Sequence, residues 1–96
     1  MTTMRQLVGE TLRARRAERG LTLREVSGKA RVSLGYISEI ERGQKEASSE
    51  LLAALCEALD MPLSGVLREV SDHVETLELD LAVEVPAAPG DVVAAA

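Results

Sequence analysis

The side chains best suited to catalysis or metal binding are few, and their spacing favours neither chemistry. Ser71, Asp72 and His73 supply a nucleophile, a carboxylate and a base, but they are consecutive, so their side chains diverge around a helix and cannot form a triad. His73 is the only histidine and has no cysteine or second histidine nearby to complete a metal site. The single cysteine, Cys56, excludes an internal disulfide, and its leucine-rich surroundings favour a buried hydrophobic role. We therefore expect no enzymatic activity, no metal and no cofactor.

A different group of polar side chains lies between Ser33 and Gly43, on a predicted short helix with both ends marked. Ser33 is a good N-cap, because its hydroxyl can accept from an amide that has no partner within the helix. Gly43 stands where a left-handed residue would close the last turn. Ile37 and Ile40 are spaced to bury on one face. The other faces carry the side chains available to a ligand: Leu34, Gly35, Tyr36, Ser38, Glu39 and Arg42.

A second short helix is predicted directly upstream. Thr22 and Glu25 have the spacing of a capping box, which opens a helix that runs to about Ala30. The next two residues leave room only for a tight turn before Ser33. Two helices joined this closely are typical of a helix-turn-helix, whose second helix usually enters the major groove of DNA. The spacing alone also allows an αα corner with no ligand, so that alternative stays open.

The residues of these two helices also resemble a known family. The similarity to the helix-turn-helix of the Xre/Cro bacterial regulators lies in Thr22-Leu23-Arg24-Glu25-Val26, Val32-Ser33, Tyr36-Ile37-Ser38 and Ile40-Glu41-Arg42-Gly43. It continues through Leu52, Leu55, Ala58 and Leu59 to Leu67, and so covers roughly residues 5–70. The combination of residues 31–36 with residues 45–52 is narrower, and it most resembles the Clp gene regulators of actinobacteria, which are small activators of Clp protease genes.

The resemblance implies an all-α, five-helix, lambda-repressor-like DNA-binding domain in which the helix after Ser33 faces the bases. The base-facing residues that it implies are Ser33, Leu34, Gly35, Tyr36, Ser38 and Glu39. Leu34 can meet a thymine methyl group, and Glu39 can accept from cytosine N4. The residues expected at phosphates are Arg16, Arg24, Arg42, Gln44 and Lys45. Few of these side chains can hold a base through two hydrogen bonds, so specificity must come partly from DNA shape and paired half-sites.

Charge is divided unevenly along the chain, whose formal net charge is −5. Residues 1–45 hold ten Lys and Arg against five acids, whereas residues 46–96 hold only Arg68 against eleven acids. A basic half suits a phosphate-facing surface, and the acidic half must point away from DNA. No apolar run approaches the ~18 residues of a membrane span, and nothing near Met1 resembles a signal peptide. We therefore expect no membrane partner and a location in the bacterial cytoplasm, at the nucleoid.

Three further helices are predicted to support this pair. After a frayed start at residues 1–4, one helix covers about residues 5–18, ending near Gly20. Its inward-facing residues are Leu7, Val8, Leu12 and Ala14. Ser48 or Ser49 caps a fourth helix, which runs to about residue 59 and covers the back of the helix-turn-helix. Pro62 stands in the first turn of a fifth helix.

The fifth helix carries an apolar seam that continues beyond a five-helix core. Its members, Val70, Val74, Leu77 and Leu81, are spaced as in a short heptad repeat. We expect the later members to have nothing in the chain to pack against, which predicts a second copy of the protein as their partner. Acidic neighbours would crowd a parallel pair, so an antiparallel or crossed homodimer is favoured, bound to an inverted-repeat operator with half-sites about one helical turn apart. The alternation from Leu77 to Val85 also fits a β-strand, so an exchanged strand is the alternative.

These segments predict a DNA-binding domain at residues 1–70, a dimerisation segment at 71–85 and a flexible tail at 86–96. The terminal Ala95 and Ala96 resemble the tags by which Clp proteases select substrates, which makes a Clp protease a candidate partner. Activation requires a contact with RNA polymerase, for which Glu25 and Glu41 are candidates. The predicted function is a sequence-specific, dimeric transcription regulator, by resemblance an activator of Clp protease and stress-response genes. The alternative is an antitoxin-like or other protein-interaction module on the same fold.

Overall fold

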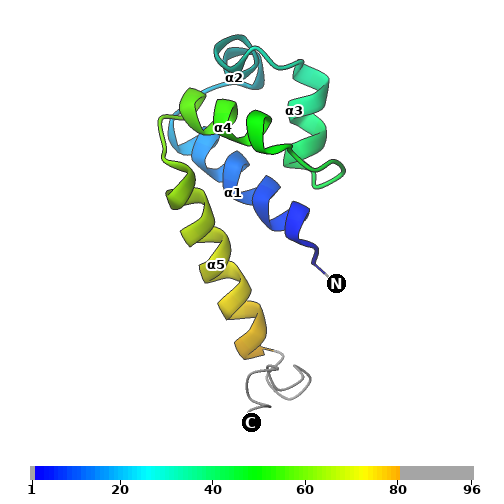
Figure 1. The fold of residues 1–96 in the computed structure, drawn as a ribbon, viewed down its shortest axis with the longest axis vertical. Helices are drawn as coiled ribbons and strands as arrows, with labels where there is room; N and C mark the ends of the chain where they lie inside the picture. The colour runs from blue at the N-terminus through cyan, green and yellow to red at the C-terminus, as the bar shows by residue number, and fades with distance from the viewer. Residues whose placement is uncertain (1, 81–96) are drawn as a thin grey trace.

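The computed structural model describes residues 2–80, which form five α-helices and no strand. The helices are α1 (Met4–Glu18), α2 (Leu23–Ala30), α3 (Leu34–Glu41), α4 (Ser49–Ala58) and α5 (Leu63–Asp80). Figure 1 shows α2 and α3 at one end of the molecule, with α5 running toward the other end. The predicted all-α, five-helix fold is confirmed. The alternative strand from Leu77 to Val85 is wrong for residues 77–80, which are helical. The rest of that strand, and the predictions for Leu81, Ala95 and Ala96, lie outside the described residues.

Side-chain caps fix the beginnings of the first four helices. Thr22 and Glu25 form the predicted capping box, and Ser33 and Ser48 cap α3 and α4. A further capping box, between Thr3 and Gln6, begins α1 at Met4, so the prediction of a frayed start is wrong for Thr3 and Met4. Each cap satisfies an amide that the first helical turn leaves without a partner, and each sets where a helix begins.

The core lies where α1 packs against α3 and α5, and where α4 packs against α2 and α5. It is almost entirely aliphatic, and its buried members are Leu7, Leu12, Val26, Val32, Ile37, Ile40, Leu55, Cys56, Leu59, Met61, Val66 and Val70. Burial raises the pKa of the Cys56 thiol above its usual value, as expected for a cysteine in a hydrophobic role. The prediction that Ala14 faces inward is wrong, because it is exposed. Thr11 is buried instead, and its hydroxyl donates to the Leu7 carbonyl at 2.9 Å.

The seam of α5 is only partly free. Pro62 directly precedes the helix rather than standing in its first turn. Val70 belongs to the core, and Val74 and Leu77 are partly buried against it. The expectation that the later seam has nothing to pack against is therefore wrong for Val74 and Leu77. Neither α5 nor any other helix in residues 2–80 is long and apolar enough to cross a membrane.

Candidate nucleic-acid interface

The turn between α2 and α3 is held from both sides. The amides of Arg31 and Val32 both donate to the Ser27 carbonyl, at 2.9 and 3.2 Å. The Ser27 hydroxyl donates in return to the Val32 carbonyl at 2.5 Å. Arg31 adopts a left-handed conformation, with φ 59° and ψ 44°, which ends α2 and redirects the chain. The predicted pair of short helices with a tight turn is therefore present, with Val32 buried beneath it.

The inner side of α3 lies directly on α1. Ile37 and Ile40 are buried as predicted, and the backbone at the end of α3 lies against the part of α1 that contains Gly9. A Cβ atom at Gly9 would overlap the carbonyl oxygens of Ile40 and Glu41. The two helix backbones therefore approach as closely as a glycine permits, which fixes the position of α3.

A nearly buried ion pair joins the same two helices. Arg16 donates to Glu41 through two hydrogen bonds, Nε to Oε2 at 2.7 Å and Nη2 to Oε1 at 3.0 Å. Its Nη1 donates to the Leu21 carbonyl at 2.9 Å. The Arg16 and Glu41 side chains are only 17% and 8% exposed. Hydrogen bonding to Glu41 raises the pKa of Arg16 above its usual value, against the opposing effect of burial.

This pair changes the expected roles of both residues. The sequence predicted a phosphate contact for Arg16, but its donors are used inside the fold. Glu41, a candidate contact for RNA polymerase, is likewise nearly buried. The helix periodicity gave no sign of the pair, because its members lie 25 positions apart in the chain.

The outer side of α3 carries the predicted base-facing residues. Ser33, Leu34 and Gly35 are exposed, while Tyr36, Ser38 and Glu39 are partly buried. The Ser33 hydroxyl accepts from the Tyr36 amide at 3.1 Å, so it acts as the cap of the helix. Beside Gly35 there is open space where a side chain would stand, which leaves the backbone free to approach a ligand. The structure thus brings all six residues to the first turns of one accessible helix.

Cations and polar groups flank this surface. Arg24, Arg42, Gln44 and Lys45 are exposed, as phosphate contacts must be. Arg42 donates to the Ser38 hydroxyl, and it contacts the side-chain oxygen of Gln44 at 3.5 Å. Arg13, from the basic run at residues 13–16 of α1, lines the same two shallow surface grooves as Arg42.

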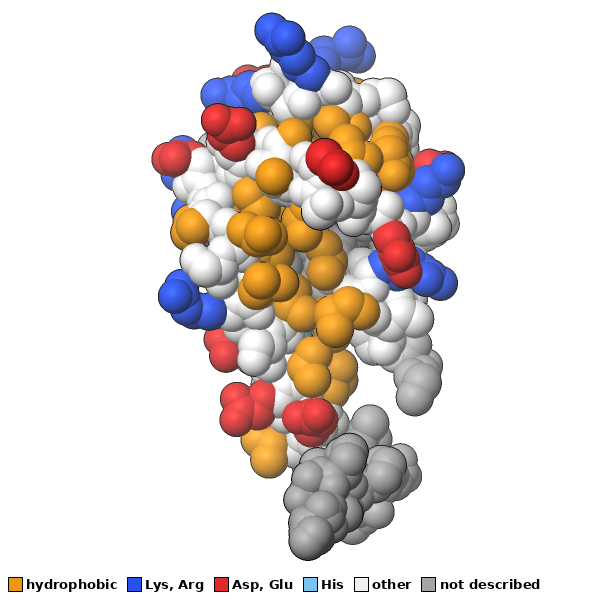
Figure 2. Space-filling view, viewed as in Figure 1, with side chains coloured by type: hydrophobic (Ala, Val, Ile, Leu, Met, Phe, Trp, Pro, Cys, Tyr) orange, Lys and Arg blue, Asp and Glu red, His pale blue; other side chains and the backbone are white. Residues whose placement is uncertain are grey.

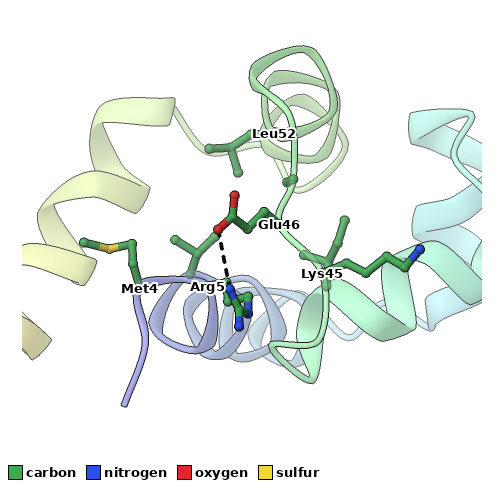
Figure 3. Close-up of a pocket in the computed structure, with 8 residues that line it drawn as sticks. Met4, Arg5, Lys45, Glu46 and Leu52 are labelled. Carbon is green, nitrogen blue, oxygen red and sulfur yellow. Dashed lines mark ion pairs between the residues drawn. The ribbon is translucent and has the colours of Figure 1, made fainter. Parts of the chain in front are cut away.

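The loop after α3 folds back onto the helix. Gly43 adopts φ 75°, which closes α3 as predicted, and its carbonyl accepts from Arg5 Nε at 3.2 Å. The Tyr36 hydroxyl donates to the Glu46 carbonyl at 3.3 Å. Behind the loop lies a largely apolar pocket of about 220 Å³, across which Arg5 and Glu46 form an ion pair at 3.5 Å (Figure 3). The loop is therefore anchored to both α1 and α3.

Comparisons with known proteins agree with this geometry. A family model described as a helix-turn-helix domain matches residues 7–70. The transcriptional regulator ClgR of Mycobacterium tuberculosis is 57% identical over 75 residues, which cover 78% of this chain and 67% of that protein. The crystal structure of the clp gene regulator ClgR from Corynebacterium glutamicum matches with a TM-score of 0.75 and 46% identity, over 84% of this chain and 88% of that one.

A more distant structure shares the fold. The restriction-modification controller protein C.AhdI from Aeromonas hydrophila matches with a TM-score of 0.61 and 27% identity, over 69% of this chain and 94% of that one. The match to the family model, over residues 7–70, includes both helices of the motif and the supporting core. The chain therefore belongs to the helix-turn-helix transcriptional regulators and, within them, to the ClgR family.

Proposed function

We propose that this regulator binds an inverted-repeat DNA operator as a homodimer and activates Clp protease and stress-response genes. The observation that carries the DNA-binding proposal is the exposed outer side of α3, held in place by its close packing on α1. The Clp target genes are inferred from the relative in Corynebacterium glutamicum, which is titled a clp gene regulator.

In this proposal α3 lies in the major groove with its first turns at the base edges. Leu34 meets a thymine methyl group, and Glu39 accepts from a cytosine amino group. The exposed side chains around α3 bind the phosphate backbone: Arg13, Arg24, Arg42, Gln44 and Lys45. These phosphate contacts supply much of the affinity and make it depend on salt.

A second copy of the chain would cover an exposed apolar surface of the fold. Figure 2 shows hydrophobic side chains gathered over α4, α1 and the upper part of α5. On α5, Leu63 and Leu67 are 43% and 54% exposed, and they lie on the same helix face as the partly buried Val74 and Leu77. An exposed apolar surface of this kind is typical of an interface. Two copies would place two α3 helices on half-sites about 34 Å apart.

DNA binding is tested by fluorescence anisotropy with a Clp protease promoter fragment and a scrambled duplex, each at two salt concentrations. We expect tight binding to the promoter that weakens with salt. Arg42→Ala should weaken it at least about tenfold and reduce the salt slope by about 1 for each subunit, because each subunit loses one phosphate contact. Arg68→Ala is the matched control, since Arg68 is exposed on α5, away from α3. Equal and feeble binding to both duplexes would overturn the proposal.

The dimer is tested by sedimentation of the intact chain. Leu67→Glu should shift the protein toward monomers. It should also weaken operator binding, because the two half-sites are then bound independently. Leu79→Glu is the control, because Leu79 is 72% exposed and lies outside the seam. A wild-type protein that is monomeric when bound to operator would contradict the dimer.

A further inference from the structure

A carboxylate in the middle of a DNA-facing surface needs a physical reason. Glu39 lies on the outer side of α3, among the residues proposed to meet base edges. A fixed negative charge there is repelled by phosphates from every direction unless a partner neutralises it. The inference below rests on the proposed function, and it concerns how that partner is exchanged.

Lys45 neutralises Glu39 in the free protein. Its Nζ lies 3.8 Å from Glu39 Oε1 and 5.7 Å from the centre of the Tyr36 ring. Figure 3 shows the Lys45 side chain directed away from the apolar pocket and along α3. The loop that carries Lys45 is held in this position, because the Gln44 amide donates to the Glu39 carbonyl at 2.8 Å and Tyr36 donates to the Glu46 carbonyl.

This arrangement allows exchange. The Lys45 and Glu39 side chains are 55% and 39% exposed, so water and ions screen their attraction. The contact is also longer than those of the nearly buried pair between Arg16 and Glu41. A hydrogen-bond donor that reaches Glu39 can therefore replace the lysine, and the released ammonium group can move to a phosphate.

We propose that Glu39 is a specificity-determining residue that withholds Lys45 from the DNA backbone until a base donates to Glu39 in its place. At the correct site, a cytosine amino group donates to Glu39, and Lys45 binds a phosphate. At an incorrect site, no donor reaches Glu39, so Lys45 stays on the carboxylate and one phosphate contact is missing. Recognition of one base thus adds a phosphate contact of Lys45. The energy of that phosphate contact does not itself depend on the DNA sequence.

The test compares salt slopes of binding for the wild type, Glu39→Gln, Lys45→Met and the double variant, on operator and on scrambled duplex. Lys45→Met should flatten the operator slope by about 0.9 for each bound subunit, since each neutralised phosphate contributes about 0.9. Glu39→Gln should steepen the scrambled slope by about 0.9 for each bound subunit, because it frees Lys45 for any phosphate. The double variant should return the scrambled slope to the wild-type value.

Glu46→Gln is the matched control. Glu46 is an exposed acid in the same loop, but it pairs with Arg5 rather than with Lys45. Its loss should leave the scrambled slope unchanged, which separates release of Lys45 from a general gain of positive charge. The proposal is overturned if Lys45→Met leaves the operator slope unchanged, or if Glu39→Gln leaves the scrambled slope unchanged. Failure of the proposed function has a different signature, because the wild type would then show no preference for operator at all.

Discussion

The two sides of α3 differ in how their contacts are built. The inner side packs Ile37 and Ile40 against α1, with a backbone approach at Gly9 and a nearly buried ion pair at Glu41. The outer side makes only exposed contacts, such as that of Glu39 with Lys45. Two acids of one helix, two positions apart, are thus held to very different degrees.

This difference shows how a short helix can be both firmly placed and free to bind. Eight residues are too few to form a stable isolated helix, so the position of α3 depends on its inner side. The outer side can then keep weak contacts that a ligand exchanges without disturbing the fold. Substitutions on the inner side should act on stability, and those on the outer side on binding.

The largest effect is expected where α1 and α3 meet. Gly9→Ala forces the two backbones apart, and it should lower the free energy of unfolding by about 3 kcal/mol. Gly28→Ala is the matched control, because Gly28 is also helical but has open space around it. There the change should raise stability by about 0.5–1 kcal/mol. Urea denaturation measures both, and a fully stable Gly9→Ala variant would contradict the close approach.

Substitution of glutamine for Glu39 and for Glu41 should distinguish the outer side of α3 from its inner side. Glu41→Gln leaves the nearly buried Arg16 guanidinium without its charged partner and should lower the free energy of unfolding by about 2 kcal/mol. Glu39→Gln should change it by less than about 0.5 kcal/mol, because the contact is exposed.

Replacement of both partners of the inner pair gives a further check. The variant Arg16→Met with Glu41→Leu removes both charges and fills similar volume, so it should recover most of the stability lost in Glu41→Gln. Thermal melts of the wild type, Glu39→Gln, Glu41→Gln and the double variant give the comparison. Equal destabilisation by Glu39→Gln and Glu41→Gln would remove the distinction between the two sides.

A smaller effect than at the two inner contacts of α3 is expected at the turn that leads into this helix. Arg31 holds a left-handed conformation without being a glycine, which costs about 1 kcal/mol. Arg31→Gly should therefore raise the free energy of unfolding by up to about 1 kcal/mol and leave the helices in place. Urea denaturation measures the gain, and the circular dichroism spectrum checks the helix content. A loss of stability would mean that the arginine side chain contributes a contact of its own.

Local signals in the sequence predicted most of the fold. The capping box at Thr22 and Glu25, the Ser33 cap and the left-handed Gly43 each depend on neighbours within a few residues, so each can be recognised in the chain itself. The resemblance to a known family placed the outer residues of α3 together. Both kinds of prediction concern residues whose environment is set by one helix.

Contacts between distant segments could not be predicted in this way. Arg16 looked like one of several arginines on an exposed helix face, and only the folded structure brings it to Glu41. No pattern in the neighbouring sequence distinguished Gly9, because the need for a glycine there comes from the close approach of α3. The sequence placed Val74 and Leu77 in a free seam. How far α1 extends along α5, and so whether it covers them, depends on how the helices pack.

The position of Tyr36 has a practical consequence. It is the only tyrosine in a chain that has no tryptophan or phenylalanine, so near-ultraviolet emission of the protein comes from this one ring. The ring lies beneath Lys45, on the helix proposed to enter DNA, and its hydroxyl is bonded to the loop. The unlabelled protein therefore carries its own optical reporter, and this reporter lies where α3 meets its loop.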